Sequence, residues 1–168
     1  MIDEKDFFRE STIRICGTLD IEKALRDCLI YIRNFIPADL IFMSTYDPDS
    51  GVSEVVASAD VNKGQIISKK LISPQDRHDV IINMIDSAHA APIIIVADRV
   101  KDHPAMGAYE EFSIKPDASV MVIGPKPEWN YFGGIALVSQ TGEKYTQAHQ
   151  RLFALLNEPF AIAFINYI

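Results

Sequence analysis

Residues 20–59 read DIEKALRDCLIYIRNFIPADLIFMSTYDPDSGVSEVVASA, which is a helix pattern followed by a hairpin pattern. Apolar residues recur every three or four positions after Asp20, so we expect an amphipathic helix with Asp20 as its N-cap and Pro37 after its end. Residues 40–46 are rich in apolar and β-favouring side chains, and the turn sequence DPDSG follows them. A second strand at residues 52–59 completes the hairpin. The stretch therefore predicts a long helix beside two antiparallel strands.

The other elements follow from the same kinds of pattern. We expect further helices at residues 3–16, 73–88, 105–112 and 146–168, and further strands at residues 65–72, 92–97, 118–124 and 131–139. The polar run 65–72 is typical of a sheet edge, whereas the fully apolar run 92–97 is typical of a buried strand. We predict an α+β fold with a mostly antiparallel sheet of about six strands, the terminal helices on one face and the shorter middle helices on the other. The whole chain, residues 1–168, is expected to be one domain.

Composition and charge limit the possible functions. The 168 residues carry a net charge of −7, which would repel the phosphates of DNA and RNA, so no direct nucleic-acid contact is expected. No apolar run is long enough to span a membrane, and the polar start MIDEKD differs from a secretory signal, so we expect a cytoplasmic protein. Cys16 and Cys28 lie in helix patterns without metal or redox spacing and are expected to be buried free thiols.

Several short segments resemble the GAF domain, and together they extend over nearly the whole chain. They are residues 15–25 (ICGTLDIEKAL), 36–39 (IPAD), 46–51 (YDPDSG), 131–138 (YFGGIALV) and 144–149 (KYTQAH). The phrase EPFAIA at residues 158–163 is similar to the N-terminal input domains of bacterial sigma-54-dependent transcriptional regulators. The resemblance implies a GAF-like, PAS-related fold and a sensory domain cut from a longer regulator, in which an ATPase domain and a helix-turn-helix follow.

The sequence also departs from well-known branches of that family. Cyclic-nucleotide-binding members carry the motif Asn-Lys-x-Phe-Asp-Glu, but here Gly64 follows Asn62 and Lys63 and the rest of the motif is absent. Bilin-binding members and the methionine sulfoxide reductases need cysteines near the pocket, whereas Cys16 and Cys28 lie in the first two expected helices. The resemblance therefore implies neither chemistry, and no cofactor is expected.

The loop DRVKDH at residues 98–103 is the most chemically varied stretch of the chain. The resemblance implies that this loop borders the pocket, so Asp98, Arg99 and His103 are candidate contacts to a small anion or polar ligand. A solvated loop with ordinary turn chemistry explains the same residues. The four histidines are scattered without metal-ligand spacing, so we expect no metal site.

Further candidate ligand contacts come from the expected sheet and the short helix before it. These are Met43, Thr45, Phe112 and Met121. Alternation along the first strand puts residues 41, 43 and 45 on one face and residues 42, 44 and 46 on the other, but it leaves open which face meets the terminal helices. A mixed apolar and polar wall suits a small ligand, and a closed core without ligand remains the alternative. No GxSxG elbow or phosphate-binding GxxxxGK sequence is present, so we expect no enzyme.

The last expected helix is apolar nearly all round its axis. A helix at the surface of a monomer should show a single apolar stripe, so we expect one face to pack on the sheet or first helices and the other on a partner subunit or a following domain. Pro159 is expected to bend this helix. The candidate dimer-interface residues are Phe8, Phe153, Leu156, Phe160 and Phe164.

The function expected from these patterns is that of a signal-sensing input domain. It would bind an unknown small molecule, form a homodimer through its terminal helices, or do both, and so control an attached transcription-activating ATPase. The alternative is a constitutive dimerisation module without a ligand. A small-molecule enzyme on the same scaffold is a third hypothesis.

Overall fold

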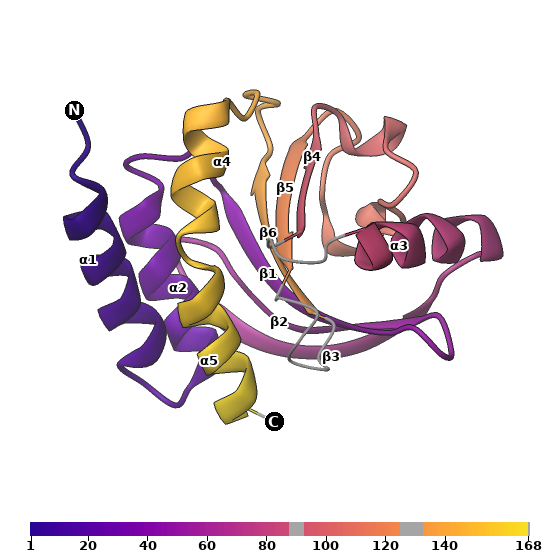
Figure 1. Cartoon of the computed structure of the whole chain (residues 1–168), viewed down its shortest axis with the longest axis horizontal. Helices are drawn as coiled ribbons and strands as arrows, with labels where there is room; N and C mark the ends of the chain where they lie inside the picture. Colours follow the sequence, from indigo (N-terminus) through magenta and orange to yellow (C-terminus); the bar gives the residue numbers. More distant parts are fainter. Residues whose placement is uncertain (88–92, 125–132, 168) are drawn as a thin grey trace.

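A six-stranded antiparallel sheet forms the centre of the computed structural model, which describes residues 1–87, 93–124 and 133–167 (Figure 1). The helices are α1 (Glu4–Cys16), α2 (Ile21–Ile32), α3 (Gln75–Ser87), α4 (Gln147–Ala154) and α5 (Asn157–Tyr167), with 3-10 turns η1 (Val100–Asp102) and η2 (Tyr109–Phe112). The strands are β1 (Leu40–Asp47), β2 (Val52–Ala59), β3 (Gly64–Ile72), β4 (Ile93–Ala97), β5 (Ser119–Gly124) and β6 (Gly133–Ser139). The predicted α+β class and antiparallel sheet are confirmed.

The strand order is β3-β2-β1-β6-β5-β4, so β3 and β4 are the two edges of the sheet. The prediction of an edge strand is confirmed for β3. The fully apolar run of β4 was expected to be a buried strand, but β4 lies at an edge and residues 94–96 are only half-buried. Its apolar character has another cause, because the half-buried Ile94 and Val96 pack against the core under the helices.

The terminal helices α1, α2, α4 and α5 all cover one face of the sheet, as predicted, while α3 lies on the other face (Figure 1). Leu25, Leu29 and Ile32 of α2 are fully buried, which confirms the apolar stripe read from the sequence. Helix α2 ends at Ile32, five residues before Pro37, because the chain leaves the helix through hydrogen-bonded turns at residues 33–36. The two chain ends therefore share one helical layer.

Contacts between α1 and the C-terminal helices hold that layer together. The Arg151 Nε lies 2.7 Å from Glu4 Oε1, which joins α4 to the start of α1. The Cys16 thiol donates to the Pro159 carbonyl at 3.6 Å, which joins the end of α1 to α5. Cys28 is buried as expected, but Cys16, the last residue of α1, is exposed, so the prediction of two buried thiols is wrong for Cys16.

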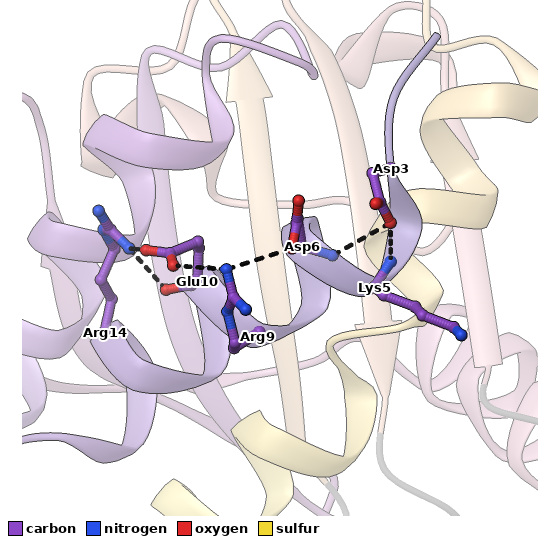
Figure 2. A network of polar contacts seen from close by, with 6 residues as sticks. All are labelled: Asp3, Lys5, Asp6, Arg9, Glu10 and Arg14. Atoms are coloured by element: carbon purple, nitrogen blue, oxygen red, sulfur yellow. Dashed lines mark hydrogen bonds and ion pairs between the residues drawn. The ribbon is translucent and has the colours of Figure 1, made fainter.

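A chain of polar contacts runs along the outer side of α1 (Figure 2). The Asp3 carboxylate caps the helix by accepting the Lys5 N–H at 2.9 Å. Further along, Arg9 pairs with Asp6 at 3.2 Å, and Arg14 pairs with Glu10 at 3.0 Å. The hydrogen bond from Arg14 lowers the pKa of the Glu10 carboxyl. This side of α1 is therefore a solvated, charged surface.

The C-terminal segment consists of two helices instead of the single bent helix that we expected. Helix α4 ends at Ala154, and the Leu155 and Leu156 N–H groups form tight turns to Leu152 and Phe153 before α5 begins. In a continuous helix, the carbonyl of Leu155 would need the N–H of residue 159. Pro159 has no N–H, and its ring would clash with that carbonyl. The break therefore lies one turn before the proline.

The break turns the large side chains of this segment inward. Phe153, Leu156, Phe160 and Phe164 are buried in the core of their own chain, so their assignment to a dimer interface is wrong. Phe8 remains at the surface. Exposed apolar side chains on the helical layer come from other positions, namely Ile13, Ile30, Ile162 and Ile165. Within the described ranges, no helix combines the length and apolar character that crossing a membrane requires.

A capping box starts α4, as the position of Thr146 suggested. The Thr146 Oγ1 accepts the His149 N–H at 3.2 Å, and the His149 Nδ1 accepts the Thr146 N–H at 3.1 Å. This second bond requires a neutral imidazole, because a protonated Nδ1 cannot accept.

Lowering the pH through about 6.5 is expected to weaken the fold through His149. Burial lowers the pKa of His149, and Glu143 opposes this shift; the Tyr145 ring also lies close, with the ring centroids 6.2 Å apart. A histidine whose pKa is lower in the folded state stabilises fully above its unfolded pKa, and the contribution is lost as the pH falls toward the folded pKa. Urea unfolding between about pH 7.5 and about pH 5 measures the loss.

The matched control is His149→Gln. Glutamine at this position of a capping box also accepts the N-cap N–H, so the variant keeps the cap and removes the titration. Burial also lowers the pKa of His103, which titrates in both proteins. A wild type and a variant with the same pH dependence would contradict the prediction.

Candidate functional site

A cavity of about 260 Å³ lies between the sheet and the segments on its second face. We call it the α3 cavity. Its floor comes mainly from β1, β5 and β6, and its cover comes from α3 and from the chain around η1 and η2. The floor includes Phe42, Ser44, Val120, Val122, Ala136 and Val138, and the cover includes Ile81, Met84, Val100, Met106, Tyr109 and Phe112.

The alternation of β1 decides which residues reach this cavity. Ile41 and Met43 point to the helical layer, where both are fully buried, and Phe42 and Ser44 point to the cavity. On β6 the cavity side presents Ala136, whose small side chain leaves space above the sheet. The face that the sequence left open is therefore settled, with the helices on the side of Ile41 and Met43.

Polar contacts hold α3 over the sheet. The Tyr46 hydroxyl of β1 is hydrogen-bonded to the His78 Nδ1 of α3. The Arg77 Nε donates to the Pro104 carbonyl at 3.3 Å, and its guanidinium lies against Gly107, where a Cβ would come within 1.9 Å of Nη1. These contacts fasten the N-terminal half of α3 to the sheet and to the loop that completes the cover.

Aromatic and ionic contacts hold the η2 side of the cover. The Phe112 ring meets the Phe42 ring edge-on with centroids 5.7 Å apart. Lys69 of β3 lies over the Phe112 ring and pairs with Glu111. These contacts tie η2 to the β1 and β3 part of the sheet.

The described lining of the α3 cavity is mainly apolar and carries no formal charge. Among its described lining residues there is no Asp, Glu, Lys, Arg or His. The polar side chains are those of Ser44, Thr45, Tyr46, Ser53 and Tyr109. Burial raises the pKa of the Tyr46 hydroxyl, and the nearby Asp47 and Asp79 add to the shift, so this phenol is neutral at physiological pH.

Thr45 and Phe112, two of the residues chosen from the sequence, line the α3 cavity. Met43 and Met121 were placed in the same cavity, and the structure corrects this. Both lie on the opposite face of the sheet, in the core under the terminal helices, because Met43 points away from its neighbours Phe42 and Ser44, and Met121 points away from Val120 and Val122.

Asp98, Arg99 and His103 lie together at a separate, open depression of about 440 Å³, which Lys144 also lines. Much of the charge here is already paired, since Arg99 contacts Asp102 at 2.5 Å. The His103 Nδ1 accepts the Ala105 N–H at 3.1 Å, and burial lowers the pKa of His103. The three residues are thus neighbours, as expected, but they do not line the α3 cavity. No cluster of His, Cys, Asp and Glu suited to a metal ion occurs in the described part of the chain.

Sequence reasoning did not choose several residues that form the α3 cavity. They include Ser44, Tyr46, Ser53, Tyr109 and Ala136. The alternation of β1 named Ser44 and Tyr46 as one of two possible faces. A signal that could have decided between the two faces of β1 is the run of small residues on β6, namely Gly133, Gly134 and Ala136. Small residues on a strand leave room for another group.

No protein-family model matches the sequence, and no curated protein matches it. Solved structures do match the fold. The GAF domain of a phosphoenolpyruvate-protein phosphotransferase from Coxiella burnetii has a TM-score of 0.68 and 14% identity, over 96% of this chain and 92% of that one. The phycoerythrobilin-bound GAF domain of a cyanobacterial phytochrome has a TM-score of 0.62 and 12% identity, over 99% and 97%.

A third similar structure is the free methionine-R-sulfoxide reductase from Neisseria meningitidis, solved with its substrate, with a TM-score of 0.64 and 10% identity over 98% of this chain and 89% of that one. Identities this low establish likeness of fold and no more. Over nearly its whole length, this chain has the fold of a GAF domain.

Proposed function

We propose that this chain is a sensory input domain that binds a small molecule in the α3 cavity. The observation that carries the proposal is the cavity itself, a mainly apolar space with a few polar groups under a separate helix. Two of the similar structures are described with a small molecule, a bilin in one and a substrate in the other. The proposal involves no catalytic step.

Strand β6 offers a short route from the cavity to the terminal helices. Gly133 lines the α3 cavity, and a Cβ built on Gly133 would lie 2.9 Å from the Phe164 Cζ of α5. One layer of backbone therefore separates a ligand from α5. A ligand that binds one position of β6 better than another shifts the equilibrium between positions of α5.

The signal would reach an attached output domain through the terminal helices. The likeness of residues 158–163 to the input domains of sigma-54-dependent regulators suggests a transcription-activating ATPase as that output. The described termini both lie on the helical layer (Figure 1), so a partner subunit or a following domain could contact α1 and α5 together. We expect this contact to occur in the cytoplasm and between two copies of the chain.

The test uses thermal unfolding with a metabolite library that covers acids, bases and neutral compounds. A cavity ligand should raise the Tm of the wild type and not that of Ala136→Phe, in which a ring fills the space above β6. Circular dichroism checks that the variant is folded, and Val122→Phe is a second filling variant. The control Ile162→Phe adds a ring on the opposite side of the molecule and should keep the ligand response. The proposed function would be refuted if no compound in the library raised the Tm of the wild type without also raising the Tm of both filled variants.

A constitutive dimerisation module is the second candidate function. Apolar side chains exposed on α1 and α5, Ile13, Ile162 and Ile165, favour a contact between subunits.

We expect the wild type to be a dimer at micromolar concentrations, and Ile162→Glu combined with Ile165→Glu to weaken the dimer about tenfold or more, because two carboxylates would lose their hydration in the contact. Analytical ultracentrifugation measures the change. Ile66→Glu, an equally exposed isoleucine on β3, is the matched control and should leave the dimer intact. A wild type that stays monomeric at high concentration would contradict dimerisation.

A further inference from the structure

The α3 cavity also restricts the chemistry of its ligand, provided that the proposed function holds. An ion that enters a site without a counter-charge loses its hydration and gains nothing comparable in return. None of the described lining residues is charged, so these residues offer no counter-charge to a carboxylate, a phosphate or an ammonium group. Asp98, Arg99 and Lys144 line the separate depression instead.

Two acidic residues near Tyr46 add to this restriction for anions. Asp47 follows Tyr46 at the end of β1, and Asp79 is on α3 next to His78. Burial is the main cause of the raised pKa of the Tyr46 hydroxyl, and both carboxylates add to it electrostatically, as they would oppose a second negative charge there.

The volume sets the size of the ligand. Drug-sized molecules occupy cavities of roughly 300–1,000 Å³. The α3 cavity has about 260 Å³ and so lies just below this range. A molecule of about two fused rings fits such a space.

Strand register gives the cavity one polar end and one apolar end. Ser44 is paired with Gly134, and Thr45, Tyr46 and Ser53 lie near the same end of the hairpin. At the other end, the cavity-lining residues Val120 and Val138 are paired with each other. In the part of the chain that the structure describes, no hydrogen bond occupies the Ser44 or Ser53 hydroxyl, so these groups can serve a ligand.

We propose that the α3 cavity binds a neutral, mainly apolar molecule of about two fused rings, whose single hydroxyl or carbonyl group meets the Ser44 end. The apolar rings lie over Ala136 and Val122 toward Val138. Binding is favoured because apolar surface leaves water while the one polar group keeps a hydrogen bond.

The test compares compounds that share one naphthalene ring system at neutral pH by calorimetry. The compounds are 2-naphthol, which is neutral, 2-naphthoate, which is an anion, and 2-naphthylmethylamine, which is a cation. We expect 2-naphthol to bind the wild type about tenfold or more tighter than either ion. Ser44→Ala should reduce the affinity for 2-naphthol about fivefold, because the hydroxyl of 2-naphthol loses its hydrogen-bond partner. The affinity for naphthalene, which has no hydroxyl, should stay unchanged. Ser58→Ala, on β2 outside the cavity, is the matched control.

The inference would be overturned if either ion bound as tightly as 2-naphthol. It would also be overturned if 2-naphthol did not bind at all. These results remain distinct from failure of the proposed function. If a charged metabolite raises the Tm of the wild type and not of the filled variants, the cavity is still a sensor site and only the ligand class is wrong. If no metabolite does so, the proposed function fails as well.

Discussion

Replacing Phe153 with alanine is expected to lower the free energy of unfolding by about 3–5 kcal/mol. Phe153 is on α4 and has 0% of its surface exposed. Its ring contacts the Phe160 ring edge-on across the break between α4 and α5. Removing it loses the transfer free energy of the ring and leaves a cavity in the core that joins the helices to the sheet. Because domains are typically stable by about 5–15 kcal/mol, this single change removes a large share of the total.

The matched control for this prediction is Phe8→Ala on α1. Phe8 is also on a terminal helix but is 39% exposed, so its loss should cost about 1 kcal/mol or less. Urea denaturation followed by circular dichroism measures both variants. Equal losses for Phe8 and Phe153 would mean that Phe153 is not a core residue, and would restore it as a candidate for the dimer contact.

Gly64→Ala is expected to destabilise the fold by about 1–3 kcal/mol, although Gly64 is at the start of the edge strand β3. A Cβ at this position would lie 2.1 Å from the carbonyl oxygen of Glu22 and 2.6 Å from its carbonyl carbon. Both atoms belong to the backbone of the first turn of α2, so the helix or the strand has to move as a unit. The glycine is therefore required by the close approach of α2 to β3.

Gly107→Ala is the matched control, because its Cβ would also come close to another group. That group is the guanidinium of Arg77, the far end of a flexible side chain that can turn away. We expect a loss below about 1 kcal/mol for Gly107→Ala in the same urea experiment. If Gly64→Ala cost no more than Gly107→Ala, the close packing of α2 on β3 would be contradicted.

Local patterns were sufficient for much of the fold. The apolar stripe of α2, the turn between β1 and β2, and the Thr146 cap of α4 depend on residues within a few positions of one another. Such signals act through backbone conformation and one helical or strand period, so they can be read from a short window of sequence. The element order and the resemblance to GAF domains followed from them.

The placement of single side chains depended on contacts between distant segments. Met43 and Ser44 are adjacent in the sequence but reach opposite sides of the sheet, and only the helices packed over Met43 decide which side is the core. The inward direction of Phe153 and Phe160 likewise depends on where the chain breaks before Pro159.

The candidate site shows the same division. Its polar and apolar residue types were visible in the sequence, and Thr45 and Phe112 were chosen correctly as cavity-lining residues. The separation of Asp98, Arg99 and His103 from the α3 cavity was not visible, since it depends on how η1, η2 and α3 close over the sheet. Periodicity is a property of neighbours along the chain, whereas a cavity is the space left between elements that meet only after folding. For that reason the amino-acid order specified the elements, and their packing alone determined where a ligand can lie.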